Sequence, residues 1–189
     1  MNINNTTIIK DDDFLLREKS IDVKMPLSKE DKDILESLID YVRKSTIPEI
    51  ALKENLKPAV GIAAPQVGIL KKMLAISFVD YDKDDNEILH EYALANPKIL
   101  STSNMLSYLK QGEGCLSVED QHLGYIYRSA KIKVRAYNLL EDKEVIIQAK
   151  GYLAIVLQHE IDHLNGVLFY DHIDKNNPFR VRDNSICIE

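Results

Sequence analysis

GYLAIVLQHEIDHLNG, the stretch from Gly151 to Gly166, decides the fold. At about 100° per residue it predicts a helix whose apolar side chains cover most of the circumference. A helix of this kind is normally buried, because it offers no broad polar face to solvent. Gly166 is well placed to end it, since glycine readily adopts the left-handed conformation that follows many helices. The sequence therefore predicts one core helix around which the other elements pack.

The segments around this helix are mostly typical of strands. Two apolar runs, 73–79 and 88–96, are expected to pair across a solvated acidic loop. The stretch 131–137 alternates polar and apolar residues, the pattern of a half-buried strand, and 144–150 is its expected partner. The predicted fold class is α+β, with mostly antiparallel strands packed around the buried helix.

Other segments are less regular. Residues 26–46 have apolar positions at helical spacing, and Ser28 can cap this helix. Residues 46–58 suggest a second short helix, and 59–68 are typical of a tight loop or an edge strand. No element is assigned to the polar, mixed tail that begins at Phe169.

Length and charge narrow the class of protein. A chain of 189 residues suits one compact domain, expected to span 1–189. A formal net charge of −6 argues against direct nucleic-acid binding, which usually needs a basic face. The first residues lack the pattern of a signal peptide, and no stretch approaches the roughly 18 apolar residues of a membrane span. We therefore expect a cytoplasmic protein without a membrane contact.

The core helix also carries a metal-binding pattern. His159 and His163 are four residues apart, so both can reach one ion from the same helix face, and Glu160 follows the first of them. A single buried histidine is more often a hydrogen-bonded core residue. Two histidines with an adjacent glutamate favour a metal site instead.

A third ligand has to come from elsewhere in the chain. His172 lies downstream, but it follows the helix end within a few residues. Cys115, between Gly114 and Leu116, is the better candidate, because a thiolate is a strong ligand for iron(II) and zinc. Two alternatives remain open for Cys115, a small buried core residue or a nucleophile paired with histidine. The second would leave Glu160 without a role.

Three segments together resemble one family, the bacterial peptide deformylases, and more specifically its longer-chain subclass. The segments are VGIAAPQ (60–66), EGCLS (113–117) and QHEIDHLNG (158–166), in the order that the family shows. The similarity extends from about Ile8 to Asp174. It implies an α+β hydrolase of protein biosynthesis that removes formate from the N-formylmethionine of newly made polypeptides.

The resemblance also implies the roles of individual residues. Cys115, His159 and His163 would hold one Fe²⁺ ion per chain, which Zn²⁺, Ni²⁺ or Co²⁺ can replace. Glu160 would be the general acid and base for attack of a metal-activated water on the formyl carbon. By the same comparison, the oxyanion would be stabilised by Gln66 and the backbone N–H of Leu116, and the backbone of Gly61 would lie against the substrate.

Further residues can be placed around this site. Tyr152, Ile155 and Val156 share the histidine face, so they are candidates to wall an apolar pocket for a methionine side chain. Ordinary core packing is the alternative and does not exclude that role. Glu113 and Arg128 are candidates for an ion pair that braces the cysteine loop, although surface charges are the default.

The chain departs from the family pattern in two places. Ala59 stands where the first motif usually begins with glycine. Residues 174–189 do not form the basic helix that some members use on the ribosome, so any ribosome contact should be transient and use another surface. The expected partner is the N-formylmethionyl nascent peptide, and the protein is expected to be a monomer.

Two other classes of protein share part of the pattern. A metalloprotease that cleaves within peptides would also use the two histidines and Glu160, but it has no use for a cysteine ligand. A structural metal module would need a fourth protein ligand, and no other cysteine or histidine has a suitable context.

Overall fold

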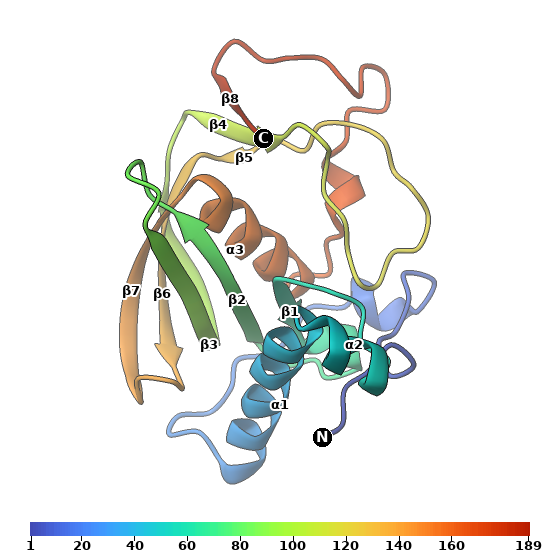
Figure 1. Cartoon of the computed structure of the whole chain (residues 1–189), viewed down its shortest axis with the longest axis vertical. Helices are drawn as coiled ribbons and strands as arrows, with labels where there is room; N and C mark the ends of the chain where they lie inside the picture. The colour runs from blue at the N-terminus through green and yellow to red at the C-terminus, as the bar shows by residue number, and fades with distance from the viewer.

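The computed structural model describes all 189 residues and is built around an antiparallel sheet. Its five strands lie in the order β1-β2-β3-β6-β7, and helix α3 (Gly151–His163) crosses beside it (Figure 1). The strands of this sheet are β1 (Gly61–Ala63), β2 (Met73–Tyr81), β3 (Glu87–Thr102), β6 (Lys131–Asn138) and β7 (Lys143–Lys150).

A smaller three-stranded sheet lies at one end of the molecule (Figure 1). In it, β4 (Leu106–Leu109) pairs antiparallel with β5 (Arg128–Ser129) and parallel with β8 (Ser185–Ile188). The C-terminal tail, to which the sequence assigned no element, therefore ends as an edge strand. A short 3-10 helix, Phe169–His172, precedes it.

Both predicted helices before the sheet are confirmed. Helix α1 (Lys29–Ser45) begins after Ser28, whose Oγ accepts the backbone N–H of Asp31. Its apolar face packs into a core cluster with residues of β2 and β3. Helix α2 (Pro48–Glu54) begins with a proline, which needs no hydrogen-bond acceptor in the first turn.

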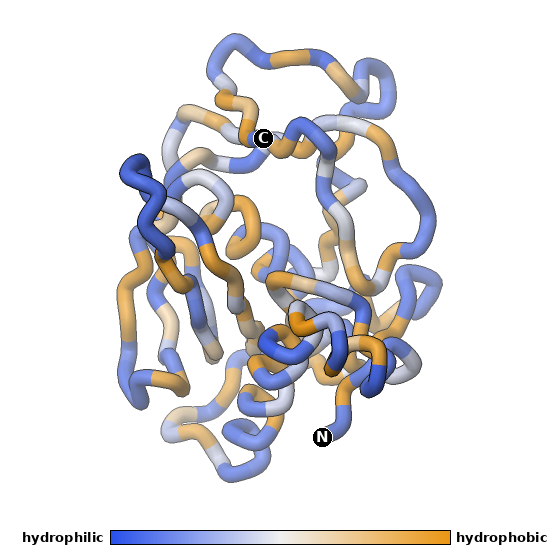
Figure 2. The backbone as a smooth tube through the Cα atoms, in the orientation of Figure 1, coloured by the Kyte–Doolittle hydropathy of each residue, from blue (hydrophilic) through white to orange (hydrophobic).

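The predicted strand pairs are also confirmed. β2 pairs with β3 from Met73–Ala95 to Tyr81–Glu87, and the turn between them is hydrophilic, as Figure 2 shows. β3 continues to Thr102 instead of ending at Asn96, because its later part pairs with β6 across an irregularity in register. Pro97 lies in this irregularity, where a strand tolerates a residue without an N–H.

Helix α3 lies between the sheet and the remaining loops. One of its faces packs on the sheet in a core cluster that includes Leu153, Leu157 and Val134. The other face carries the two histidines. The helix ends at His163, and Gly166 follows with a φ of 72°. None of the helices in the structure is long and apolar enough to cross a membrane.

Gly166 should matter for stability, for two reasons. A Cβ at this position would collide with the carbonyl oxygen of Arg17, and its φ is positive. Gly68 has a similar φ of 76°, but a Cβ there would meet nothing within 4 Å. We expect Gly166→Ala to lower the free energy of unfolding by about 2 kcal/mol or more, and Gly68→Ala by about 1 kcal/mol. Urea unfolding measures both, and equal losses would contradict the role of the collision.

Candidate metal centre and active site

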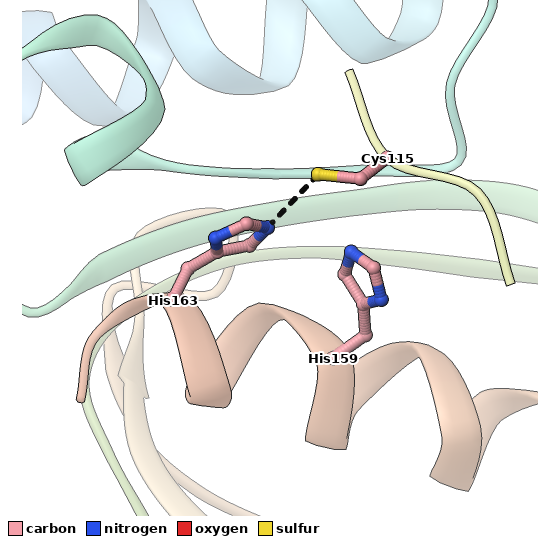
Figure 3. A group of neighbouring side chains, drawn as sticks. All are labelled: Cys115, His159 and His163. Carbon is pink, nitrogen blue, oxygen red and sulfur yellow. Dashed lines mark hydrogen bonds between the residues drawn. The ribbon is translucent and has the colours of Figure 1, made fainter. Parts of the chain in front are cut away.

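Three side chains from two parts of the chain converge at one point (Figure 3). His159 and His163 come from α3, and Cys115 comes from the loop between β4 and β5. The ligand atoms of the three residues lie within 4.8 Å of one another, and Sγ of Cys115 is 3.3 Å from Nε2 of His163. His172 is not part of the group; its Nε2 lies 2.8 Å from Oδ2 of Asp162.

The chemistry of this group fits a transition-metal ion. One sulfur and two imidazole nitrogens are donors that iron(II) and zinc prefer. His163 is buried with no hydrogen-bond partner for Nδ1. Burial, and then the nearby charge of His159, hold the pKa of His163 well below its usual value. The His163 ring is therefore neutral, the form that coordinates a metal.

A buried carboxylate orients the other histidine. Nδ1 of His159 lies 2.8 Å from Oε2 of Glu113, and an ionised carboxylate can only accept a hydrogen bond. Burial alone would raise the pKa of Glu113, but hydrogen bonds from His159 and Arg128 lower it to about 2. Nδ1 of His159 therefore carries a proton and donates to Glu113. Burial opposes the charged form, but hydrogen bonds with Cys115 and Glu113 raise the pKa of His159 to about 10 in the metal-free protein, so a metal would displace the proton of its Nε2.

Arg128 in turn holds Glu113 in place. Its Nε and Nη2 lie 2.5 and 2.8 Å from the two carboxylate oxygens of Glu113, and its Nη1 lies 2.8 Å from Oδ2 of Asp162. The predicted Glu113–Arg128 pair is confirmed. It does not lie at the surface, because the two side chains are only 4% and 3% exposed. An arginine can hold two carboxylates in this way because its five donors have a fixed planar geometry.

Glu160 is buried in contact with Gly61. A Cβ on Gly61 would come within 2.9 Å of the carboxyl carbon of Glu160, so only glycine permits this approach. Oε2 of Glu160 has no hydrogen-bond partner in the protein. Burial raises the pKa of Glu160 to about 7, although the nearby charges of His159 and Arg128 act in the opposite direction.

Gln66 lies beside the cysteine. It belongs to a 3-10 helix (Ala64–Val67) directly after β1, and it is buried rather than exposed. Its Oε1 accepts the N–H of Ala63, and its Nε2 lies 3.4 Å from Sγ of Cys115 and 3.2 Å from Oγ of Ser117. These contacts fix the side-chain amide with its donor end toward the sulfur.

Most of the site residues line one cavity of about 610 Å³. The three residues expected to wall a pocket, Tyr152, Ile155 and Val156, all line it. They also pack: Ile155 and Val156 are buried, and the ring of Tyr152 meets that of Phe78 edge-on, with centroids 5.0 Å apart. The cavity is also lined by other residues of the predicted site, Gly61, Gln66, Cys115, Leu116, His159 and Glu160.

A family model, described as polypeptide deformylase, matches residues 5–179. The chain belongs to the polypeptide deformylase family. Peptide deformylase 2 of Bacillus subtilis (strain 168) is 48% identical over 182 residues, which cover 96% of this chain and 96% of that protein. Peptide deformylase 2 of Geobacillus stearothermophilus is 48% identical over 181 residues, again with 96% of both proteins covered.

Solved structures agree with this assignment. A crystal structure of peptide deformylase from Ehrlichia chaffeensis in complex with actinonin matches with a TM-score of 0.70 and 30% identity, covering 94% of this chain and 92% of that one. The Met-Ala-Ser bound peptide deformylase of Acinetobacter baumannii matches with a TM-score of 0.67 and 29% identity, covering 92% of this chain and 100% of that one. The predicted α+β class is confirmed, and the chain is an enzyme, a hydrolase of the peptide deformylase type.

Members of this family depend on a metal and remove the N-formyl group from newly made peptides.

Sequence reasoning did not find every residue around the metal group. No role was assigned from the sequence to Asp162, Ser117 or Lys10, which the structure places around this group. Asp162 is separated from Arg128 by 34 residues, so no local pattern connects the two.

Proposed function

We propose that Cys115, His159 and His163 hold one Fe²⁺ ion per chain, and that this centre removes formate from the N-formylmethionine of nascent polypeptides. Zn²⁺, Ni²⁺ or Co²⁺ would replace the iron, because thiolate and imidazole ligands suit all of them. The observation that carries the proposal is the convergence of three donor atoms beside a cavity that also contains an unpartnered carboxylate. Three protein ligands leave a coordination position for chemistry.

Glu160 is the proposed general acid and base. When bound, the metal lowers the pKa of a water molecule and supplies a nucleophile near neutral pH. Glu160 accepts the proton of this water through its unpartnered Oε2 and passes it to the leaving amine. A pKa of about 7 suits a group that must gain and lose a proton in one cycle.

Two donors are proposed to stabilise the oxyanion. As the formyl carbon becomes tetrahedral, its oxygen gains negative charge, which the Nε2 of Gln66 and the N–H of Leu116 can meet. The Gln66 amide is already oriented by Ala63 and Ser117. The N–H of Leu116, next to the cysteine, has no acceptor within the protein. Removal of one such donor typically costs about 10²–10³ in rate.

The substrate would lie along the cavity. Gly61, which has no side chain, would bring its backbone against the peptide. Tyr152, Ile155 and Val156 would surround the methionine side chain, whose flexible, unbranched shape fits an apolar pocket.

We further propose that the chain acts as a single-domain monomer in the cytoplasm, without direct nucleic-acid binding. Any contact with the ribosome would be transient. Residues 174–189 would not supply a helix for it, because Ser185–Ile188 form strand β8. The net charge of −6 likewise gives no general attraction to RNA.

The test is formate release from formyl-Met-Ala-Ser by protein purified without oxygen and loaded with Fe²⁺. We expect rapid release that falls to background after the metal is removed with a chelator, and that returns when Fe²⁺, Ni²⁺, Co²⁺ or Zn²⁺ is added. Unformylated Met-Ala-Ser is the control and should remain intact. Absence of formate from a folded, metal-loaded sample, or cleavage of the control peptide, would rule out the proposal.

A further inference from the structure

The N-terminal segment contacts two neighbouring parts of the site, the 3-10 helix Ala64–Val67 and the loop between β4 and β5. The N–H of Ile9 donates to the carbonyl oxygen of Gln66 at 2.9 Å, and the N–H of Asp11 donates to that of Ser117 at 2.9 Å. The residue between them points its side chain toward the cysteine loop. Residues 9–11 therefore connect the segment that carries the oxyanion amide to the loop that carries Cys115.

Lys10 makes the side-chain contact of this segment. Its Nζ donates to the carbonyl oxygen of Leu116 at 3.2 Å and lies 3.0 Å from Oε1 of Glu119. The lysine side chain is 28% exposed, while that of Glu119 is 71% exposed. An ion pair with so exposed a partner contributes little by itself. The contact with the Leu116 carbonyl is the better-shielded of the two.

The peptide group that Lys10 contacts also faces the sulfur. The carbonyl of Leu116 and the N–H of Ser117 belong to one peptide unit, and this N–H lies 3.4 Å from Sγ of Cys115. A cation at the oxygen end of a peptide unit polarises it, which makes the N–H end a stronger donor. The positive charge of Lys10 thereby strengthens the hydrogen bond from the Ser117 N–H to the cysteine sulfur.

We propose that Lys10 is a positioning residue of the metal centre. It holds the Leu116–Ser117 peptide so that the Ser117 N–H stabilises the thiolate of Cys115. The inference rests on the proposed function, because it takes Cys115 as a metal ligand. Hydrogen bonds to a ligand atom from outside the coordination shell orient that ligand and tune its metal, and their loss typically lowers metal affinity or activity about 10- to 100-fold.

The experiment uses the full chain loaded with Co²⁺ in the absence of oxygen. Two quantities are measured: metal affinity, by competition with a chelator, and the absorption band that arises from the cobalt–thiolate bond. We expect Lys10→Met to weaken cobalt binding about tenfold and to shift this band. Lys10→Arg keeps a cationic donor and should restore both properties.

Glu119→Gln is the matched control. It removes the exposed ion pair but leaves Lys10 in contact with Leu116, so cobalt affinity and the band should match those of the wild type. Thermal unfolding followed by circular dichroism checks that each variant is folded. If Lys10→Met does not fold, Lys10→Gln replaces it, with the same loss expected.

Three outcomes would overturn the inference. A folded Lys10→Met protein with wild-type cobalt affinity and an unshifted band would show that the lysine has no influence on the thiolate. A Glu119→Gln protein with the same defects as Lys10→Met would assign the effect to the ion pair. Wild-type protein that neither binds cobalt nor releases formate would defeat the proposed function and this inference together; wild-type activity with an inert Lys10 defeats the inference alone.

Discussion

Glu160→Gln is expected to lower kcat for formate release by about 10²–10⁴ while the protein keeps its bound metal. Glutamine has nearly the same shape as glutamate, but its amide cannot accept the proton of the attacking water. Glu160 is not one of the three converging ligands, and its Oε2 has no hydrogen-bond partner in the protein. Metal content, measured on the same samples as formate release, should therefore remain at one ion per chain.

Glu160→Asp provides the comparison. It retains a carboxylate but withdraws it by one methylene from its place beside Gly61. We therefore expect a rate of formate release between those of the wild type and Glu160→Gln. If Glu160→Gln loses its metal, the residue holds the ion rather than the proton. If the variant keeps both metal and wild-type kcat, Glu160 has no part in proton transfer.

Arg128→Met is expected to lower the free energy of unfolding by about 3–5 kcal/mol. The arginine is 3% exposed and binds both oxygens of the buried Glu113, as well as Asp162. Methionine fills much of the same space but leaves two carboxylates without their shared cation. Urea unfolding of the metal-free protein would measure the loss.

Arg43→Met is a close control for this substitution. Arg43 also binds a glutamate through two nitrogens, with Nε and Nη2 at 2.8 and 2.6 Å from the carboxylate of Glu91. Its side chain is 44% exposed, so solvent screens the pair and we expect a loss of about 1 kcal/mol or less. Similar losses for the two variants would contradict the importance of burial at Arg128.

Much of the fold was predictable because its main elements have local patterns. The apolar circumference of α3 and the alternation along β6 and β7 follow from periodicities within each segment. The smaller sheet was not predictable in this way. β8 pairs with β4 across nearly eighty residues, and both strands have only four residues, too few for a period to stand out.

The residues of the candidate site also differ in whether a local sequence pattern predicts them. His159 and His163 form a pattern within one helical turn. The glycine-flanked setting of Cys115 and then the family motif pointed to the third ligand, which the structure brings within reach of both histidines. The brace through Arg128 could be suspected only as one of many charge pairs in the sequence. Its burial, and the contact of Lys10 with the cysteine loop, depend on tertiary packing that no local pattern encodes.

Helix α3 limits which positions of this sequence can be substituted without loss of function. Its sheet-facing side chains are committed to the core, and its opposite face carries the two histidines and Glu160. Even its polar edge is occupied: Gln158 bonds both the N–H and the carbonyl of Ser129, and Asp162 bonds Arg128. Few positions on the helix are therefore open to neutral substitution. Variation among functional descendants should instead accumulate in the solvated β2–β3 turn and on the exposed face of α1, where a changed side chain loses few contacts.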